Sequence, residues 1–375
     1  MNKKALRADI LLLLTAAIWG FGFVAQRSGM EYTGPFAFNG IRFILGSFSL
    51  LPFILIRRKR FNQVFSAKRL LLSSLLLGSV LFTAVELQQI GIIFTTAGNA
   101  GFITGLYVVL TPLFGIFLGR KTGLPTWVGS VLTLTGLYFI SVAGNPGSVN
   151  PGDIIIIISA FFWAAHVLLI DRLMNTDVRA KVDKKARDAS AETGPVRETL
   201  LQETPVSPEP PDMSSHLDPI EVSAGQFAVC GVLALFGSFL VEPFIGPMVE
   251  RINPSLLSAG LFAWKPFPEL IAAIREGTVS VSFDALIPIL YGGLCSVGIA
   301  YTLQVIAQRD APPAHATIIL CFEGSFAAIG GALLLSEKAG LWTLLGFIFM
   351  LAGMMATQWD VIGKLVINKS VSDSN

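Results

Sequence analysis

Residues 87–115, LQQIGIIFTTAGNAGFITGLYVVLTPLFG, indicate the architecture of the chain, because similar sequence features recur in the same order on both sides of this stretch. Shifted by 216 positions, the stretch meets residues 303–331, LQVIAQRDAPPAHATIILCFEGSFAAIGG, and the Leu-Gln pairs that open the two stretches coincide. Other landmarks recur in the same order, namely Trp19 with Trp163, Pro35 with Pro219, Gly129 with Gly346, and Gly136 with Gly353. Two halves with one order of landmarks indicate a duplicated unit.

Composition places the chain among the integral membrane proteins. Hydrophobic residues make up 53% of it, charged residues only 14%, and the mean hydropathy is +0.67. A soluble domain carries roughly 25% charged residues. Cys230, Cys295 and Cys321 lie in apolar runs without CxxC spacing, which predicts neither a disulfide framework nor a zinc site. No metal or cofactor is expected.

The apolar windows predict an all-α fold. A helix of about 20 apolar residues crosses a hydrocarbon layer of roughly 30 Å. The chain contains ten such windows, at residues 8–27, 35–56, 70–93, 97–119, 125–143, 153–173, 219–241, 284–307, 313–335 and 340–359. Ten transmembrane helices are therefore expected, with five in each repeat.

The distribution of Lys and Arg predicts the orientation of these helices. Most of the cations in loops and tails fall on one side of the predicted membrane: Lys3, Lys4, Arg7, the RRKR run at 57–60, Lys68, Arg69, Arg120, Lys121, Arg309, Lys364 and Lys369. Arg27 and Lys338 fall on the opposite side. This bias favours a multi-pass protein of the cytoplasmic membrane with both termini in the cytoplasm. Because five is odd, the second unit enters the membrane inverted relative to the first, which is typical of transporters.

Two segments interrupt the repeat pattern. Residues 174–217 are rich in charged residues, Pro, Ser and Thr, which predicts a disordered cytoplasmic insert. The alternative is that this insert is a regulatory or phosphorylated segment. Residues 243–283 predict a long extracytoplasmic loop within the second repeat. The expected division of the chain is a first repeat at 1–147, a second repeat at 148–173 and 218–360, and a cytoplasmic tail at 361–375.

Several motifs resemble those of a known family. The first half contains LQ-x-x-G, TTA and GLYVVL-x-P, carried by Leu87, Gln88, Gly91, Thr95 to Ala97, Gly105 to Leu110 and Pro112. In the second half, Glu323 lies within the ninth window of the chain, and Ser336 and Glu337 follow directly after that window. In these features the chain resembles the EamA-type members of the drug/metabolite transporter superfamily. Where that family usually has Pro after the ninth-window acid, this chain has Gly324, which leaves a proline kink in doubt.

The resemblance implies two inverted five-helix units around a central cavity, and the transport of small metabolites, often amino acids. Site residues are sought among the polar groups that lie at membrane depth, because an ionisable side chain there costs roughly 2.5–3.5 kcal/mol and usually faces a cavity or a partner. Arg42 and Glu86 each lie about seven residues inside one end of a window, so roughly 10 Å deep. They are either a structural ion pair, or Arg42 binds an anionic substrate group and Glu86 is a released partner or proton site.

Glu323 lies near the middle of the ninth window, without an obvious cation beside it in the sequence. Burial disfavours its charged form, so Glu323 is predicted to carry a coupled proton, with a structural hydrogen-bonded acid as the alternative. His166 shares a helical face with Trp163 and is a candidate substrate contact, although packing is the more usual role of such a histidine.

Aromatic and amide side chains complete the predicted site. Trp19 and Trp163 fall half-way through their windows rather than in interfacial belts, and Phe23 and Gln26 follow Trp19 on the same face. They predict an aromatic wall for a partly apolar solute, with helix packing as the alternative. Gln88 and Gln304, which align across the repeats, are further candidate substrate contacts.

Other classes of protein fit the sequence less well. HExxH, G-x-S-x-G and GxxxxGK[ST] motifs are absent, so an enzyme is not expected. The predicted function is a secondary transporter that moves a small zwitterionic or anionic metabolite by alternating access, with proton coupling as an option. The alternatives are a lipid translocase or a membrane sensor. The expected partners are the lipid bilayer and a small-molecule substrate, without nucleic acid, and a homodimer remains open.

Overall fold

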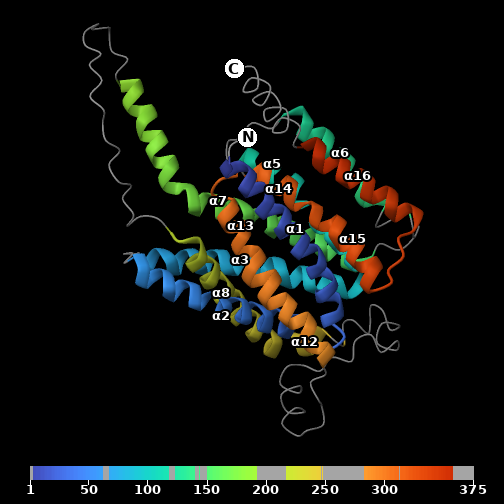
Figure 1. The fold of residues 1–375 in the computed structure, drawn as a ribbon. Helices are drawn as coiled ribbons and strands as arrows, with labels where there is room; N and C mark the ends of the chain where they lie inside the picture. Colours follow the sequence, from blue (N-terminus) through green and yellow to red (C-terminus); the bar gives the residue numbers. More distant parts are fainter. Residues whose placement is uncertain are drawn as a thin grey trace.

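The computed structural model describes residues 3–61, 67–117, 123–139, 143, 150–191, 217–245, 247, 283–311 and 313–357. These residues form a bundle of helices (Figure 1). The first half contains α1 (Lys3–Gly29), α2 (Pro35–Phe61), α3 (Ala67–Phe94), α4 (Ala97–Thr104), α5 (Tyr107–Phe117) and α6 (Leu124–Tyr138). The second half contains α7 (Pro151–Ala191), α8 (Pro219–Leu240), α12 (Phe283–Leu290), the π-helix η3 (Tyr291–Tyr301), α13 (Thr302–Ala307), α14 (Pro313–Leu320), α15 (Phe322–Leu334) and α16 (Leu341–Thr357).

Each of the ten apolar windows is mainly helical over its described residues, which confirms the prediction of an all-α membrane protein. Seven helical segments among the described residues are long and apolar enough to cross a membrane, and the shorter apolar helices are Trp127–Tyr138, Phe322–Leu334 and Leu341–Ala356. Three windows are interrupted: α4 is followed by α5, α12 continues through η3 into α13, and α14 is followed by α15. Interruptions inside a membrane are tolerated where the backbone lines a cavity or is buried in protein.

Several of the main helix contacts recur when the two repeats are exchanged. α2 packs on α8, and α6 packs on α16, so helices at equivalent positions pair with each other. The contact of α3 with α7 is matched by the contacts of α1 with η3 and α13, and the contact of α3 with α8 by that of α2 with η3. The structure therefore contains the inverted pair that the sequence predicts, with its core between the repeats.

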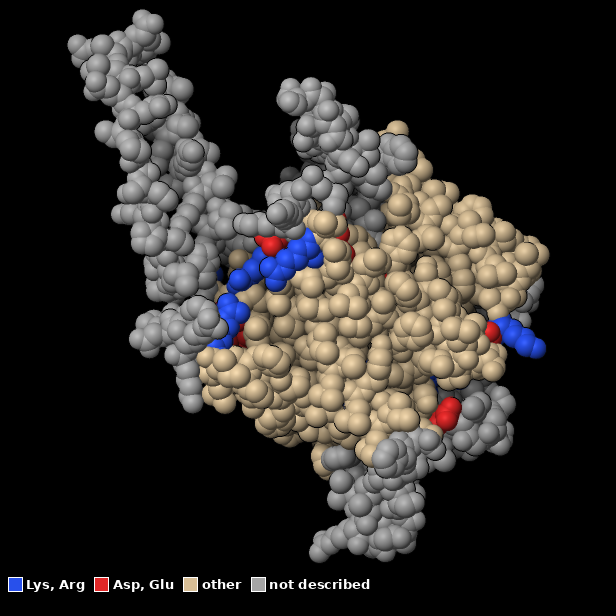
Figure 2. All heavy atoms as spheres, in the orientation of Figure 1, with Lys and Arg blue, Asp and Glu red and all other residues tan. Residues whose placement is uncertain are grey.

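Charged side chains mark the ends of this bundle. On the face drawn in Figure 2, they gather toward opposite ends, and the central surface is almost entirely uncharged. At one end, Arg57 pairs with Asp218 (3.2 Å) and Arg58 pairs with Glu221 (2.7 Å), which ties the end of α2 to the start of α8. An uncharged central band flanked by charges is the surface that a bilayer requires.

The structure corrects one expectation about the chain between the sixth and seventh windows. Residues 174–191 were expected to be disordered, but α7 continues through them to Ala191. The stretch from Asp177 to Ala191 contains Ala, Lys, Arg and Asp but neither Gly nor Pro, so nothing in it breaks a helix. The rest of the expected insert at 192–216, most of the expected loop at 243–283 and the tail at 361–375 lie outside the described residues.

Glycines let α6 and α16 approach closely, and this contact gives the first testable prediction. A Cβ atom added to Gly136 would lie 2.5 Å from Met350 Cγ and 2.6 Å from the carbonyl oxygen of Gly346. Gly136→Ala should therefore destabilise the protein by about 1–3 kcal/mol, because the helices must move apart. Thermal unfolding in detergent measures this as a lower Tm. Gly340→Ala is the matched control, since a Cβ there meets nothing within 4 Å; equal Tm values for the two variants would contradict the prediction.

Candidate functional site

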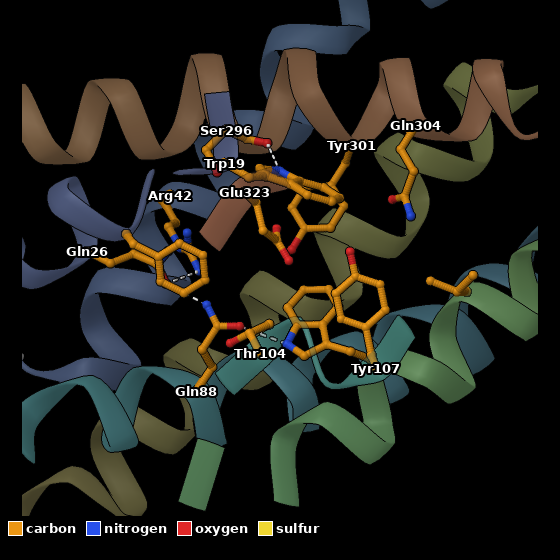
Figure 3. Close-up of a pocket in the computed structure, with 13 residues that line it drawn as sticks. Trp19, Gln26, Arg42, Gln88, Thr104, Tyr107, Ser296, Tyr301, Gln304 and Glu323 are labelled. Carbon is orange, nitrogen blue, oxygen red and sulfur yellow. Dashed lines mark hydrogen bonds between the residues drawn. The ribbon is translucent and has the colours of Figure 1, made fainter. Parts of the chain in front are cut away.

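A small central cavity of about 30 Å³ lies between the two repeats (Figure 3). Nine helical elements contribute to its lining, from α1 to α5 in the first repeat and from α7 to α15 in the second. The lining residues are Trp19, Phe23, Gln26, Arg42, Gln88, Thr104, Tyr107, Trp163, Val167, Ser296, Tyr301, Gln304 and Glu323.

Several lining residues are equivalent under the internal repeat. Trp163 lies 144 positions after Trp19, and Val167 lies the same 144 positions after Phe23. Glu323 lies 216 positions after Tyr107, which is also the spacing between the two Leu-Gln pairs. The equivalent lining pairs are thus Trp19 with Trp163, Phe23 with Val167, Gln88 with Gln304, and Tyr107 with Glu323. The cavity therefore surrounds the axis that relates the repeats, where inverted-repeat transporters place their substrate.

Three aromatic rings form one wall of the cavity. The ring centroids of Trp19 and Tyr301 are 4.6 Å apart in an edge-on arrangement, and that of Trp163 lies 6.1 Å from Tyr301 and 6.5 Å from Trp19. The indole of Trp19 donates a hydrogen bond to the carbonyl oxygen of Ser296 at 3.1 Å. This bond satisfies the indole N–H, so the ring faces can contact an apolar part of a solute.

A chain of hydrogen bonds connects this wall to the arginine. The indole of Trp163 donates to Gln88 Oε1 at 2.8 Å, and Gln88 Nε2 donates to Gln26 Oε1 at 3.3 Å. Gln26 Oε1 also accepts from Arg42 Nη2 at 3.4 Å. Side chains from α1, α2, α3 and α7 are thus linked (Figure 3), which fixes the rotamer of each around the cavity.

Arg42 is a buried cation without a carboxylate partner in the described part of the chain. Its side chain is only 2% exposed, and its Nε donates to Asn39 Oδ1 at 2.8 Å. The guanidinium lies 5.6 Å and 5.0 Å from the ring centroids of Phe38 and Phe43. These neutral contacts hold the charge in place and leave it available to an anionic group, which a guanidinium can bind through two donors.

Glu86 is buried near this arginine, but these two described residues form no ion pair with each other. Neither carboxyl oxygen of Glu86 has a hydrogen-bond partner within the described ranges. Glu86 acts on Arg42 only through longer-range attraction.

Glu323 is the acidic group of the cavity. It is 3% exposed and extends from the first turn of α15 into the space that Tyr107 and Tyr301 also enter (Figure 3). Some polar atoms of the lining have no hydrogen-bond partner among the described residues, namely Thr104 Oγ1, Tyr107 Oη, Gln304 Oε1 and Glu323 Oε1. Because buried polar atoms are nearly always satisfied, this part of the cavity is suited to water or to a polar solute.

The structure brings most of the sequence-predicted site residues together. Those that line the cavity are Arg42, Trp19, Phe23, Trp163, Gln88, Gln304 and Glu323. Glu86 and His166 are buried but do not line it. His166 Nε2 lies 2.9 Å from Gln226 Oε1, and its ring stands edge-on to Trp163, so it supports the aromatic wall from behind.

Sequence reasoning did not select Thr104, Tyr107, Val167, Ser296 or Tyr301. A signal existed for the two tyrosines, because both fall well inside their windows, as Trp19 and Trp163 do. No comparable signal marks the threonine, the serine or the valine, since small and aliphatic residues are common on every face of a membrane helix.

Glu242, just beyond the end of α8, gives a prediction about stability and pH. Its side chain is fully buried, and burial raises the pKa of its carboxyl from 4.5 to about 8. Between these values the folded protein keeps the proton and the unfolded protein loses it, so this group makes the protein less stable as pH rises through the range. Glu242→Gln should therefore flatten the decline of Tm with pH. The exposed Glu31→Gln is the control, and identical pH profiles for the two variants would contradict the prediction.

The fold and cavity together define a membrane protein of two inverted helical repeats with an enclosed, charged site between them. Its family follows from comparison with known proteins: the model of the EamA-like transporter family matches residues 6–142 and 248–358. The chain belongs to this family, as the sequence motifs predict.

Relatives include an "Uncharacterized transporter" of Archaeoglobus fulgidus, 34% identical over 186 residues, which are 47% of this chain and 54% of that protein. Another is the "Uncharacterized inner membrane transporter YedA" of Escherichia coli K12, 28% identical over 150 residues, or 39% and 47% of the two chains. The chain spans about half the length of the curated relatives it matches. A solved crystal structure shares the fold with a TM-score of 0.55 at 14% identity, over 94% of this chain and 96% of the other.

Proposed function

We propose that the protein is a secondary transporter that moves a small metabolite by alternating access. The observation that carries this proposal is the enclosed cavity between inverted repeats, lined by repeat-equivalent pairs such as Gln88 and Gln304. In such folds the substrate site lies at the repeat interface, and the halves rock around it. Membership of a family of transporters supports the same function.

The lining favours a zwitterionic or anionic solute with an apolar part. Arg42 offers two donors to a carboxylate, and Glu323 with its neighbouring polar atoms can accept from an ammonium group or hold a proton. The rings of Trp19, Trp163 and Tyr301 can contact the apolar part. The related amides of Gln88 and Gln304 add donors and acceptors for polar groups of the solute.

A cytoplasmic-membrane location with both termini in the cytoplasm belongs to this proposal. The start of α1 and the end of α16 lie at one end of the bundle (Figure 1). Among the described residues, Arg7 near the start of α1, Arg57 and Arg58 near the end of α2, and Lys68 at the start of α3 lie at this same end, which favours the cytoplasm. The name of the Escherichia coli relative, an inner membrane transporter, agrees with this location.

A lipid translocase is less well supported by the geometry. A lipid headgroup needs a polar groove that opens sideways to the bilayer, whereas Arg42 and Glu323 are buried inside the bundle at 2% and 3% exposure. A second hollow lies between α1, the junction of α12 with η3, and the end of α15, and its lining is mainly apolar. It is lined by Phe21, Val24, Ala25, Ser28, Tyr32, Ile287, Pro288, Tyr291, Leu334 and Leu335.

Transport by purified protein in liposomes tests the proposed function. Amino acids and related metabolites are screened with and without a pH gradient across the membrane. Saturable uptake of a zwitterionic or anionic solute that depends on the protein supports the proposal. Movement only down the gradient of the solute indicates a facilitator or exchanger without proton coupling. Absence of transport for every soluble compound, with movement of labelled lipid between leaflets, would overturn the proposal in favour of a translocase.

A further inference from the structure

Glu337 joins the turn that follows α15, in the second repeat, to a broken helix of the first repeat. It follows α15 in the chain, and its Oε1 accepts a hydrogen bond from the backbone N–H of Ala97 at 2.8 Å. Its Oε2 accepts from the N–H of Gly98 at 3.2 Å. These are the first two residues of α4, where backbone N–H groups have no partner within the helix and the helix dipole attracts an anion.

The backbone around Glu337 directs its side chain to this position. Ser336 adopts a left-handed conformation with φ of 54°, and the N–H groups of Leu335 and Glu337 both bond to the carbonyl oxygen of Gly331 at 3.0 Å. This turn ends α15 and sends the next residue toward α4. Arg27 lies nearby, where it donates to the carbonyl oxygens that end α3, and it attracts Glu337 at longer range.

This contact lies at the end of the bundle opposite the start of α1 and the end of α16, here called the distal end; the other end is the proximal end. α4 packs closely against α15 on the distal side of the cavity. A Cβ on Gly101 would lie 2.6 Å from Ala327 Cβ, and one on Gly324 would lie 3.1 Å from the backbone of Phe102. The repeat-equivalent helices at the proximal end, α5 and α14, are packed much more loosely over their described residues.

The sequence shows that the proximal end cannot build the same contact. Under the repeat offset, Glu337 corresponds to Lys121, and Ala97 corresponds to Pro313. A lysine has no acceptor atoms, and a proline has no N–H to donate. The acceptor and the first donor of the contact are both lost, although the repeats otherwise share their plan.

We propose that Glu337 is a positioning residue that latches α4 to α15 and so holds the cavity closed at its distal end. Because the sequence of the proximal end lacks the acceptor and the first donor of this contact, the protein without substrate rests with its cavity accessible from the proximal side. The direction of this bias rests on the proposed function, in which the halves rock around the cavity. Loss of the latch shifts the population toward the state that is open at the distal end.

Cysteine accessibility tests the latch without any substrate. Thr104→Cys places a reporter in the cavity, in a background in which Cys230, Cys295 and Cys321 are replaced by alanine. A membrane-impermeant maleimide is added to one side of oriented proteoliposomes at a time. With Glu337 intact, labelling is expected from the proximal side. In Glu337→Ala, the distal-side rate should rise about tenfold or more, because two charge-assisted hydrogen bonds are lost.

Two further variants make the result specific. Glu31→Gln removes an exposed acid that also attracts Arg27, and it should leave the sidedness unchanged. Glu337→Gln keeps one acceptor oxygen and should give an intermediate distal rate; if Glu337→Ala does not fold, this variant carries the test. A distal rate that is unchanged in folded Glu337 variants, or that rises equally in Glu31→Gln, overturns the latch. If no solute is transported but Glu337→Ala still raises the rate of labelling from the distal side, the proposed substrate class is rejected and the latch is supported.

Discussion

Replacement of Arg42 with alanine is expected to weaken binding of the transported solute by roughly 10- to 100-fold, without loss of the folded protein. Hydrogen bonds to a charged group contribute roughly 1.5–3 kcal/mol, and about 1.4 kcal/mol is tenfold in affinity. Arg42 lines the cavity and pairs with no carboxylate of the described residues, so its removal leaves no bonded anion behind. Arg42→Lys should lose part of the affinity, because the charge is kept but the paired donors are not.

Binding to detergent-solubilised protein and uptake into liposomes measure this effect. Arg58→Ala, which breaks an exposed ion pair with Glu221, is the control and should bind the solute normally. Normal affinity in folded Arg42→Ala would exclude Arg42 as a substrate contact. If Arg42→Ala unfolds and a second change, Glu86→Gln, restores folding, then the attraction between the two buried charges is structural and Arg42 serves stability.

Replacement of Glu323 with glutamine is expected to abolish accumulation driven by a pH gradient while counterflow of the solute persists. Glutamine keeps the size and hydrogen-bonding capacity of the side chain but cannot release a proton. With one proton coupled to each solute, a gradient of one pH unit supports about tenfold accumulation, since it stores about 1.4 kcal/mol. The variant should reach equal concentrations on both sides.

Glu242→Gln is the matched control for this experiment. Glu242 is also fully buried, but it does not line the cavity, so its replacement should leave accumulation near the unaltered level. Accumulation by Glu323→Gln that equals that of the unaltered protein would show that Glu323 carries no coupled proton. Loss of accumulation in both variants would point to general damage to the protein rather than to loss of a proton site.

The ten helices could be predicted from the sequence because the thickness of a bilayer imposes a local constraint on each one. An apolar run of the required length has few structures open to it other than a spanning helix. The interruptions between α4 and α5 and between α14 and α15 were not predicted, since hydropathy reports the polarity of side chains and not the dihedral angles of the backbone. The helical continuation of α7 was missed because overall composition was given more weight than the absence of Gly and Pro.

The faces of the helices were harder to predict than their positions. In a soluble protein an apolar stripe marks the buried face. In this bundle lipid and core are both apolar, so position along a helix does not reveal whether a side chain faces the cavity. Trp19 and Glu323 do face it, whereas Glu86 and His166, chosen by the same reasoning, are buried between helices. Only the packing of the helices in three dimensions separates these cases.

A cation without a bonded counter-ion, as found at Arg42, has a consequence for energetics when the protein works in a polarised membrane. In the proposed cycle, the protein carries this charge when the empty cavity switches its access from one side of the membrane to the other. In the step with solute bound, an anionic solute neutralises the charge. An elementary charge that crosses the whole field changes in free energy by about 2.3 kcal/mol per 100 mV. The membrane potential therefore acts on the return of the empty protein more than on the loaded step, so voltage as well as concentration sets the direction of net flow.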